Sequence, residues 1–411
     1  MKIWLKLLIG SLLGVFLGFL LPGESDLIQS GLFWLQELAI QIGRYTVVPL
    51  LFFALTIAIY ELRQDKRLWS LILKTLVFIL AGTVLMVFLG IFVTFVFSRA
   101  RIHITMAEQQ ELISLHLSDA IKEIFPSNML AVFGQSGLYL LPVAVLAFFM
   151  GMGLSYDRNY TKTMISLVDS LSRIFYHIAS FFSEILGLII IILGAYWSFR
   201  FREALRADIF RDILLLIGVF SLILGFGILP ALLYLLRPKT NPWKILYGSL
   251  GAAITALVSG DINFTLPLLF RQARENLGVR RRANTVIISL FTSFGRAGSA
   301  TVAAMAFIVI IQSYSSLGVE HRDILIVALR TIGISFLLFR HPGDGAYTAI
   351  AVLSAGFSGK GFEAGYPILK PMAFYLIALG TFLDIMFASL GTYAISKIDG
   401  FQEDQEVRHY I

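Results

Sequence analysis

The sequence predicts an all-α polytopic membrane protein with about eight transmembrane helices and two re-entrant helical hairpins. Composition excludes a water-soluble globule: of the 411 residues 57% are hydrophobic and 14% are charged, and the mean hydropathy is +0.82. Several apolar stretches exceed the length that a perpendicular helix needs to cross the bilayer, which indicates tilt. Stretches long enough to cross about 30 Å of hydrocarbon lie at roughly 7–22, 32–61, 68–98, 129–154, 165–198, 212–236, 283–315 and 366–396.

The two hairpins are predicted from apolar segments that break in the middle. Segment 242–275 breaks at Gly260-Asp261, and segment 323–358 breaks at a polar run that begins with Arg340-His341 and ends with Gly345. Non-helical backbone at membrane depth is tolerated only where it is buried in protein or lines a cavity. Paired interruptions of this kind are typical of transporters, in which they mark the binding site.

The basic residues behind the net charge of +7 are placed as expected for membrane topology and not as expected for a nucleic-acid-binding surface. Basic residues fall mostly in alternate connections, which places both termini in the cytoplasm. Arg200, Arg202 and Arg206, in the connection expected at 199–206, lie on the opposite side and are an exception. The residues that support the assignment are Lys2, Lys6, Arg63, Lys66, Arg67, Arg158, Lys162, Arg237, Lys239, Lys244, Arg271, Arg274 and Arg280 to Arg282.

Nothing in the sequence indicates an enzyme or a resident cofactor. The chain has no Cys, which excludes disulfides and thiolate metal sites, and its six His residues show no metal-ligand spacing. No nucleophile, base and orienting group occur at a catalytic spacing. The apolar start of the chain has no small-residue cleavage site, so we expect it to be the first membrane span.

Several short motifs, taken in order, give the chain a family resemblance. The first span contains Gly10, Gly14 and Gly18. The other motifs, in chain order, are Val47-Val48-Pro49-Leu50, Phe125-Pro126-Ser127-Asn128, Thr265-Leu266-Pro267, Asn276-Leu277-Gly278-Val279 and Pro342-Gly343-Asp344-Gly345. With these motifs the sequence resembles the dicarboxylate/amino acid:cation symporters, the glutamate-transporter fold, as a divergent member over nearly its whole length.

The resemblance implies a homotrimer in a bacterial inner membrane, with a fixed scaffold and a transport domain that carries substrate as an elevator. Residues 1–61 would be scaffold helices 1 and 2, and 124–205 scaffold helices 4 and 5. Residues 62–123 would be helix 3 of the transport domain and an extracellular connection. The transport-domain core would be 206–411, comprising helix 6, hairpin 242–275, helix 7, hairpin 323–358 and helix 8.

The resemblance also implies binding positions, and several of them are altered here. In the family, helix 7 breaks at Asn-Met-Asp-Gly-Thr, which holds sodium, whereas this chain has Gly295-Arg296-Ala297-Gly298-Ser299. Sodium, a hard cation that prefers several oxygen ligands, remains a candidate ion although its usual ligands are missing. In helix 8, Asp384 matches the acid that accepts the substrate amino group in the family, or the family's Asn if the alignment is anchored on Gly391-Thr392. With the first alignment, the family's Arg, Thr, Asn and final Asp become Phe387, Ala388, Gly391 and Ile395.

Two arginines lie in the same predicted region. A guanidinium at the bilayer midplane costs a few kcal/mol unless it is paired, so Arg296 and Arg340 should each have a partner among Asp261, Asp344 and Asp384. We interpret Arg296 as a tethered substitute for sodium that acts with Ser299 and Asp384 in ion coupling. Proton coupling through one of the three acids is an alternative, because desolvation shifts the titration of a buried carboxyl.

The predicted function is symport of a small organic anion or an amino acid by an elevator mechanism, without the family's usual sodium sites. An uncoupled exchanger or facilitator and a non-transporting protein that kept the trimeric fold are alternatives. Structural roles are also open: Asp384 could close a salt bridge, Arg340 could pair with Asp344, and Asp261 could cap a half-helix. The predicted partners are the substrate and the lipid bilayer. The candidate substrate-binding residues are Asp261, Asn263, Thr265, Arg340, Pro342, Gly343, Asp344 and Asp384.

Overall fold

The computed structural model describes residues 2–22, 26–97, 117–126, 128–134, 139–206, 210–236, 240–314, 321–357 and 365–411. Ser127 of the fourth-span motif and most of the connection expected before it, 98–116, lie outside these ranges. Within the described residues, seven helical stretches are long and apolar enough to cross a membrane. They are Ile3–Leu20, Leu27–Gln64, Leu68–Phe97, Tyr160–Arg202, Arg211–Leu235, Arg281–Ser313 and Lys370–Ile398.

The first half of the chain contains the longest helices. α8 has 49 residues, which corresponds to a length of about 73 Å at 1.5 Å per residue. The helices of this half are α1 (Ile3–Leu20), α2 (Asp26–Arg44), α3 (Val47–Gln64), α4 (Leu68–Phe97), α5 (Leu117–Ile124), α6 (Ala131–Gly134), α7 (Leu141–Leu154) and α8 (Arg158–Arg206).

The second half consists of shorter helices that follow one another with abrupt breaks. A π-helical turn, Leu224–Ile228, joins the first two, and a short 3₁₀ turn, Leu338–Arg340, lies between α15 and α16. The helices are α9 (Arg211–Ile223), α10 (Leu229–Leu236), α11 (Pro242–Ser259), α12 (Ile262–Glu275), α13 (Arg281–Phe294), α14 (Ala297–Tyr314), α15 (His321–Ser335), α16 (Gly345–Gly356), α17 (Gly365–Ile368) and α18 (Ala373–Ile398).

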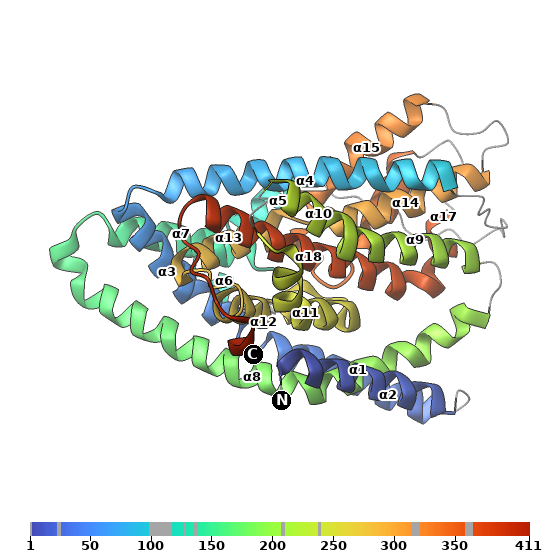
Figure 1. The fold of residues 1–411 in the computed structure, drawn as a ribbon, viewed down its shortest axis with the longest axis horizontal. Helices are drawn as coiled ribbons and strands as arrows, with labels where there is room; N and C mark the ends of the chain where they lie inside the picture. The colour runs from blue at the N-terminus through green and yellow to red at the C-terminus, as the bar shows by residue number, and fades with distance from the viewer. Residues whose placement is uncertain are drawn as a thin grey trace.

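Figure 1 shows α8 along one long edge of the molecule and α4 along the opposite edge, with α11, α12, α13 and α18 between them. The largest hydrophobic core lies in this middle region, where α14 and α18 are almost entirely buried. The two chain ends lie close together, and Lys2 Nζ donates to the carbonyl of Val407 over 3.3 Å. The short helices that surround the predicted binding site are therefore enclosed by the longer ones.

Three predicted elements differ from the structure. The stretch 129–154 is not a full span, because its main helix begins only at Leu141 with Pro142 in the first turn, a position that proline favours. The 14 residues of α7 reach about 21 Å, short of about 30 Å of hydrocarbon. The connection expected at 199–206 is the helical end of α8, and the stretch 32–61 is divided between α2 and α3.

The glycines of the first span allow α1 to pack directly on α8. A Cβ atom at Gly10, Gly14 or Gly18 would collide with Gly187 O, Ile191 O and Ser198 Oγ respectively. Small residues four positions apart let helix backbones approach closely in membranes, where van der Waals packing drives association. The regular spacing of glycines in the first span therefore allows the backbones of α1 and α8 to pack closely.

Candidate functional site

The first tip, residues 260–261, is the turn between α11 and α12, and it is buried. Gly260 ends α11 with a left-handed φ of 64°, a conformation that glycine adopts without steric cost. Asp261 then caps α12, because its Oδ1 accepts a hydrogen bond from the backbone of Phe264 at 2.8 Å. Thr265 is fully buried and its hydroxyl donates to the carbonyl of Asp261 at 2.8 Å, so it binds its own helix. Asn263 is 4% exposed.

The second tip, residues 336–344, is longer and partly exposed. Asp344 precedes α16, and its side chain is 52% exposed. Its Oδ2 lies 3.1 Å from His341 Nδ1 and accepts a hydrogen bond from Thr348 at 3.0 Å. The two tips touch, because the backbone of Ile262 donates to the carbonyl of Pro342 over 3.1 Å.

The break between α13 and α14 at Gly295 and Arg296 lies beside the second tip. Arg296 is 0% exposed, and its Nε lies 3.1 Å from Asp384 Oδ2 on α18. Its Nη2 donates to the carbonyl of His341 at 3.2 Å. Within the described part of the chain, neither Nη1 nor Nε has a hydrogen-bond partner, so the contact of Nε with Asp384 is an ion pair defined by distance. The expected partner of Arg296 is therefore present, and one edge of the guanidinium is left available.

Asp384 holds the start of α14 through several hydrogen bonds. Its Oδ1 accepts from the backbone of Gly298 at 2.7 Å and of Ser299 at 3.0 Å, and its Oδ2 accepts from the Ser299 hydroxyl at 2.6 Å. A carboxylate at this helix N-terminus is favoured by the unpaired N–H groups there. Arg296 also lies within ion-pair distance of Oδ2, so both carboxylate oxygens of Asp384 are engaged.

Two ion pairs connect the tips to distant elements. Asp261 pairs with Arg44, which ends α2, and their side chains are 1% and 16% exposed. Arg340 pairs with Glu123 of α5 at 2.6 Å. The expectation that Arg340 pairs with Asp261, Asp344 or Asp384 was therefore wrong, because its side chain extends away from the break. The sequence analysis named neither Arg44 nor Glu123 as a partner of a tip residue. Arg44 could have been found, because it is the one basic residue inside the apolar stretch 32–61.

The tips, the break and α18 form one cluster. The hydroxyl of Thr381 on α18 donates to the carbonyl of Gly260 at 3.0 Å. A Cβ atom at Gly343 would lie 2.9 Å from Asp261 Oδ2, so the backbone of the second tip lies against this carboxylate. Pro342, Gly343, Asp261, Arg296 and Asp384 are thus brought together, whereas Thr265 faces its own helix and Arg340 faces α5.

Comparison with known proteins identifies the family. A model of the sodium:dicarboxylate symporter family matches residues 3–398. The chain belongs to this family. Excitatory amino acid transporter 2 of Homo sapiens is 24% identical over 52% of this chain, and transporter 1 of Rattus norvegicus is 24% identical over 54%. Excitatory amino acid transporter 4 of Mus musculus is 22% identical over 64%.

These matches cover 37%, 40% and 46% of the length of the three relatives, so the chain spans less than half of each. Their names describe transporters. Family membership and the seven long apolar helices of the described region make the protein a multi-pass membrane protein.

The middle of α18 has an apolar face that packs on α4 and α13. Phe387 stacks on Phe78 of α4 with ring centroids 5.6 Å apart and meets Phe291 of α13 edge-on at 5.2 Å. A Cβ atom at Gly391 would collide with the same Phe291 ring. The Phe387 ring is therefore packed between α4 and α13.

The residues at the break do not fit a sodium ion. Arg296 places a positive charge there, and the carboxylate beside it is engaged by Arg296, Gly298 and Ser299. Among the described residues, no group of three or more His, Asp or Glu side chains is placed to hold a metal ion. A hard cation needs several free oxygen ligands, and the carboxylate of Asp384 is not free to be one of them.

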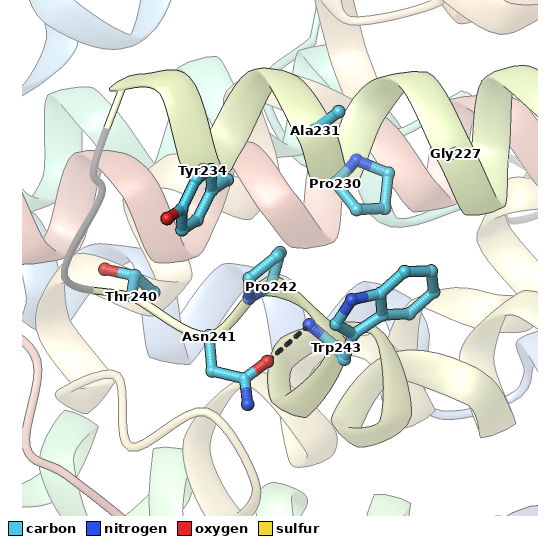
Figure 2. Close-up of a pocket in the computed structure, with 8 residues that line it drawn as sticks. All are labelled: Gly227, Pro230, Ala231, Tyr234, Thr240, Asn241, Pro242 and Trp243. Carbon is cyan, nitrogen blue, oxygen red and sulfur yellow. Dashed lines mark hydrogen bonds between the residues drawn. The ribbon is translucent and has the colours of Figure 1, made fainter.

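A separate cavity of about 560 Å³ lies between α10 and the start of α11, at the opposite end of α11 from the first tip. Figure 2 shows Tyr234 and Pro230 on one side and Trp243 on the other, with Asn241 Oδ1 accepting from the backbone of Trp243 at 3.0 Å. None of the predicted site residues lines it. It is therefore not part of the cluster at the tips.

Proposed function

We propose that the protein is a secondary transporter that carries a small organic anion or an amino acid across a bilayer. The observation that supports this most strongly is the buried Arg296–Asp384 pair, at 0% exposure for both side chains, at the place where two helix-pair tips and a helix break meet. Ionisable residues inside membrane proteins mark substrate or ion pathways. Helix ends around them supply oriented donors and acceptors without water.

The charges in the cluster favour a carboxylate-bearing substrate. Nη1 of Arg296 is buried with no hydrogen-bond partner among the described residues, and a guanidinium binds carboxylates in a planar, bidentate manner. Asp384 has both oxygens engaged, so it has little capacity left for a substrate amino group. An organic anion therefore fits better than a substrate that is recognised mainly through its amino group.

Coupling without the family's usual sodium sites is part of the proposal. Arg296 supplies a fixed positive charge at the helix break, and this charge neutralises Asp384 in the absence of a bound cation. The tethered guanidinium would hold α14 and α18 together throughout the transport cycle. Proton coupling through a carboxyl of the cluster is compatible with this arrangement.

We propose an elevator mechanism because charged pairs lie along one boundary. On one side are α12 and α13 with both tips, and on the other are α2, α3 and α8. Exposed or partly exposed ion pairs each contribute about 1 kcal/mol or less, so sliding could exchange them at low cost. By family resemblance, the working unit would be a homotrimer in an inner membrane. The boundary pairs are Arg271–Glu184, Arg281–Glu61, Arg281–Asp169 and Arg282–Asp65.

The test begins with a thermal-shift screen of amino acids and dicarboxylates in sodium, potassium and acidic buffers. A ligand that binds only the folded protein raises the unfolding temperature, so substrate and ion are identified together. Uptake of the best ligand into proteoliposomes should then persist when choline replaces sodium. Arg296→Lys keeps the charge and serves as the matched control for Arg296→Met, which should lose uptake.

Two results would contradict the proposal in different ways. Uptake that rises steeply with a sodium gradient and vanishes in choline or potassium would show that Arg296 does not substitute for a bound sodium ion. Counterflow without concentrative uptake would indicate an exchanger or facilitator. If no ligand produced a shift and no substrate was taken up, the protein would be a non-transporting member of the family.

A further inference from the structure

Another cavity, of about 310 Å³ and with a polar lining, lies at the end of the α11–α12 pair opposite the first tip. Its walls come from the start of α11, the residues that follow α12, the end of α18 and the C-terminal segment 402–410. Its size is at the lower end of the range of about 300–1,000 Å³ for small-molecule sites. Lys397 follows Asp384 by 13 residues in α18, which corresponds to about 20 Å along the helix, so the cavity is distinct from the cluster at the tips.

The C-terminal segment is fixed in place as one wall of this cavity. The backbone of Arg280 donates to Phe401 O at 2.8 Å, and that of Glu403 donates to Gly278 O at 2.9 Å. The backbone of Ile411 donates to Asn276 Oδ1 at 2.9 Å. These bonds tie the segment to the loop between α12 and α13, so the cavity is part of the folded structure.

The lining of the cavity carries an excess of positive charge. Lys244 of α11 and Lys397 of α18 both line it, and Asp404 is the one acid among its described lining residues. Lys397 Nζ donates to Tyr393 Oη at 3.1 Å. In the described part of the chain, neither lysine has an acid within ion-pair distance, whereas nearby Arg280 pairs with Glu403 at 2.9 Å.

Hydrogen-bonding groups in the wall add a second, independent indication. Thr240 lines the cavity, is 6% exposed and has a buried hydroxyl with no hydrogen-bond partner among the described residues. Leaving such a group unsatisfied costs about 1–3 kcal/mol. Thr240 and Asn241, at the entry to α11, also line the cavity of about 560 Å³ that Figure 2 shows, so they lie between the two cavities. Burial raises the pKa of Tyr410 to about 12, so its hydroxyl stays protonated and able to donate.

We propose that this cavity binds a phosphate group, held by Lys244 and Lys397 with the Thr240 and Tyr410 hydroxyls as hydrogen-bond partners. Lysine binds phosphate as a compact point charge, and two lysines against one carboxylate leave a net positive lining. The phosphate belongs either to a soluble compound or to the headgroup of an anionic lipid. A bound phosphate would link the C-terminal segment to α11 and α18. The proposal does not depend on the transported substrate.

The experiment measures binding of inorganic phosphate to the full-length protein in detergent, at constant ionic strength with chloride as the reference anion. Phosphate should raise the unfolding temperature in a saturable way. The double variant Lys244→Gln/Lys397→Gln should lose this rise, whereas Lys162→Gln, which removes an exposed lysine of α8, should keep it. A second arm uses nanodiscs with and without phosphatidylglycerol to distinguish a lipid headgroup from a soluble source.

Chemical labelling of the wild-type protein provides a readout that does not depend on the variants folding. Phosphate or anionic lipid should slow acetylation of Lys244 and Lys397, measured by mass spectrometry, and leave Lys162 unchanged. Protection by lipid alone would support the proposal with lipid as the source. The proposal is overturned if neither phosphate nor anionic lipid protects the two lysines, or if the double variant responds like the wild type.

Discussion

The two tips interrupt apolar sequence in a similar way, yet they are held differently. The first is a two-residue turn whose Asp261 is 1% exposed and paired with Arg44 of α2. The second spans 336–344, and the side chain of its Asp344 is 52% exposed and paired locally with His341. The first tip is therefore held by a buried ion pair, whereas the ion pairs of the second tip, Asp344–His341 and Arg340–Glu123, are partly exposed.

This difference indicates which tip can move. Segments that open at low free energy have exposed backbone and few buried contacts, and binding elements come from such segments. In the second tip Asp344 is exposed, whereas Leu338, Phe339 and Pro342 are buried, and the carbonyl of His341 accepts a hydrogen bond from Arg296. We infer that the second tip, whose ion pairs are partly exposed, separates from its neighbours at a lower free energy than the first tip, whose Asp261–Arg44 pair is buried.

The largest expected effect comes from removing the acid of the first tip, and the acid of the second tip provides the comparison. Asp261→Ala leaves Arg44 without its partner and removes the cap of α12, so we expect a loss of about 3–5 kcal/mol in unfolding free energy. Asp344→Ala should cost about 1 kcal/mol or less, because its pair is exposed to solvent. Denaturant unfolding in detergent, followed by tryptophan fluorescence, measures both values.

The control for this comparison is Arg44→Met in the Asp261→Ala background. It removes the unpaired charge and should recover part of the lost stability, as expected for a coupled pair. Equal losses for Asp261→Ala and Asp344→Ala would show that the two tips are not held differently.

An intermediate effect is expected at the base of the second tip. A Cβ atom at Gly345 would collide with Arg296 Nη2, whereas one at Gly333 of α15 would meet nothing within 4 Å. Overpacking makes Gly345→Ala destabilising by about 1–3 kcal/mol. Gly333→Ala should be neutral or stabilising by up to about 1 kcal/mol, from helix propensity. If both substitutions had the same effect on unfolding, the second tip would not be packed on Arg296.

The smallest effect is expected for Arg340→Met at the outer side of the second tip. Its ion pair with Glu123 has side chains that are 28% and 41% exposed, so the variant should lose less than about 1 kcal/mol. The difference from wild type should also shrink in 1 M salt, where the screening length falls to about 3 Å. Unfolding curves at low and high salt test this, and a large, salt-independent loss would indicate that Arg340 has a buried structural role.

The sequence was sufficient to locate both tips, because glycine, proline and charged residues are out of place in apolar stretches, whereas the helix break at Gly295 and Arg296 was predicted from the family resemblance. It also predicted that Arg296 has an acidic partner, since an unpaired buried guanidinium is too costly. It did not predict Arg44–Asp261 or Arg340–Glu123, whose partners are 217 residues apart in each case. Such pairs depend on how helices cross in space, which hydropathy and spacing do not encode.

The long α8 helix and the glycine face of α1 have a practical consequence for measuring motion. Backbone atoms of α8 occupy the space that side chains at Gly10, Gly14 and Gly18 would need, so the two helices cannot shift by a residue without a collision. The chain has no native cysteine, and Leu188 of α8 is 69% exposed. A spin label introduced at Leu188 would thus provide a stationary reference point, from which distances to a second label at Asp344 would report the position of the second tip.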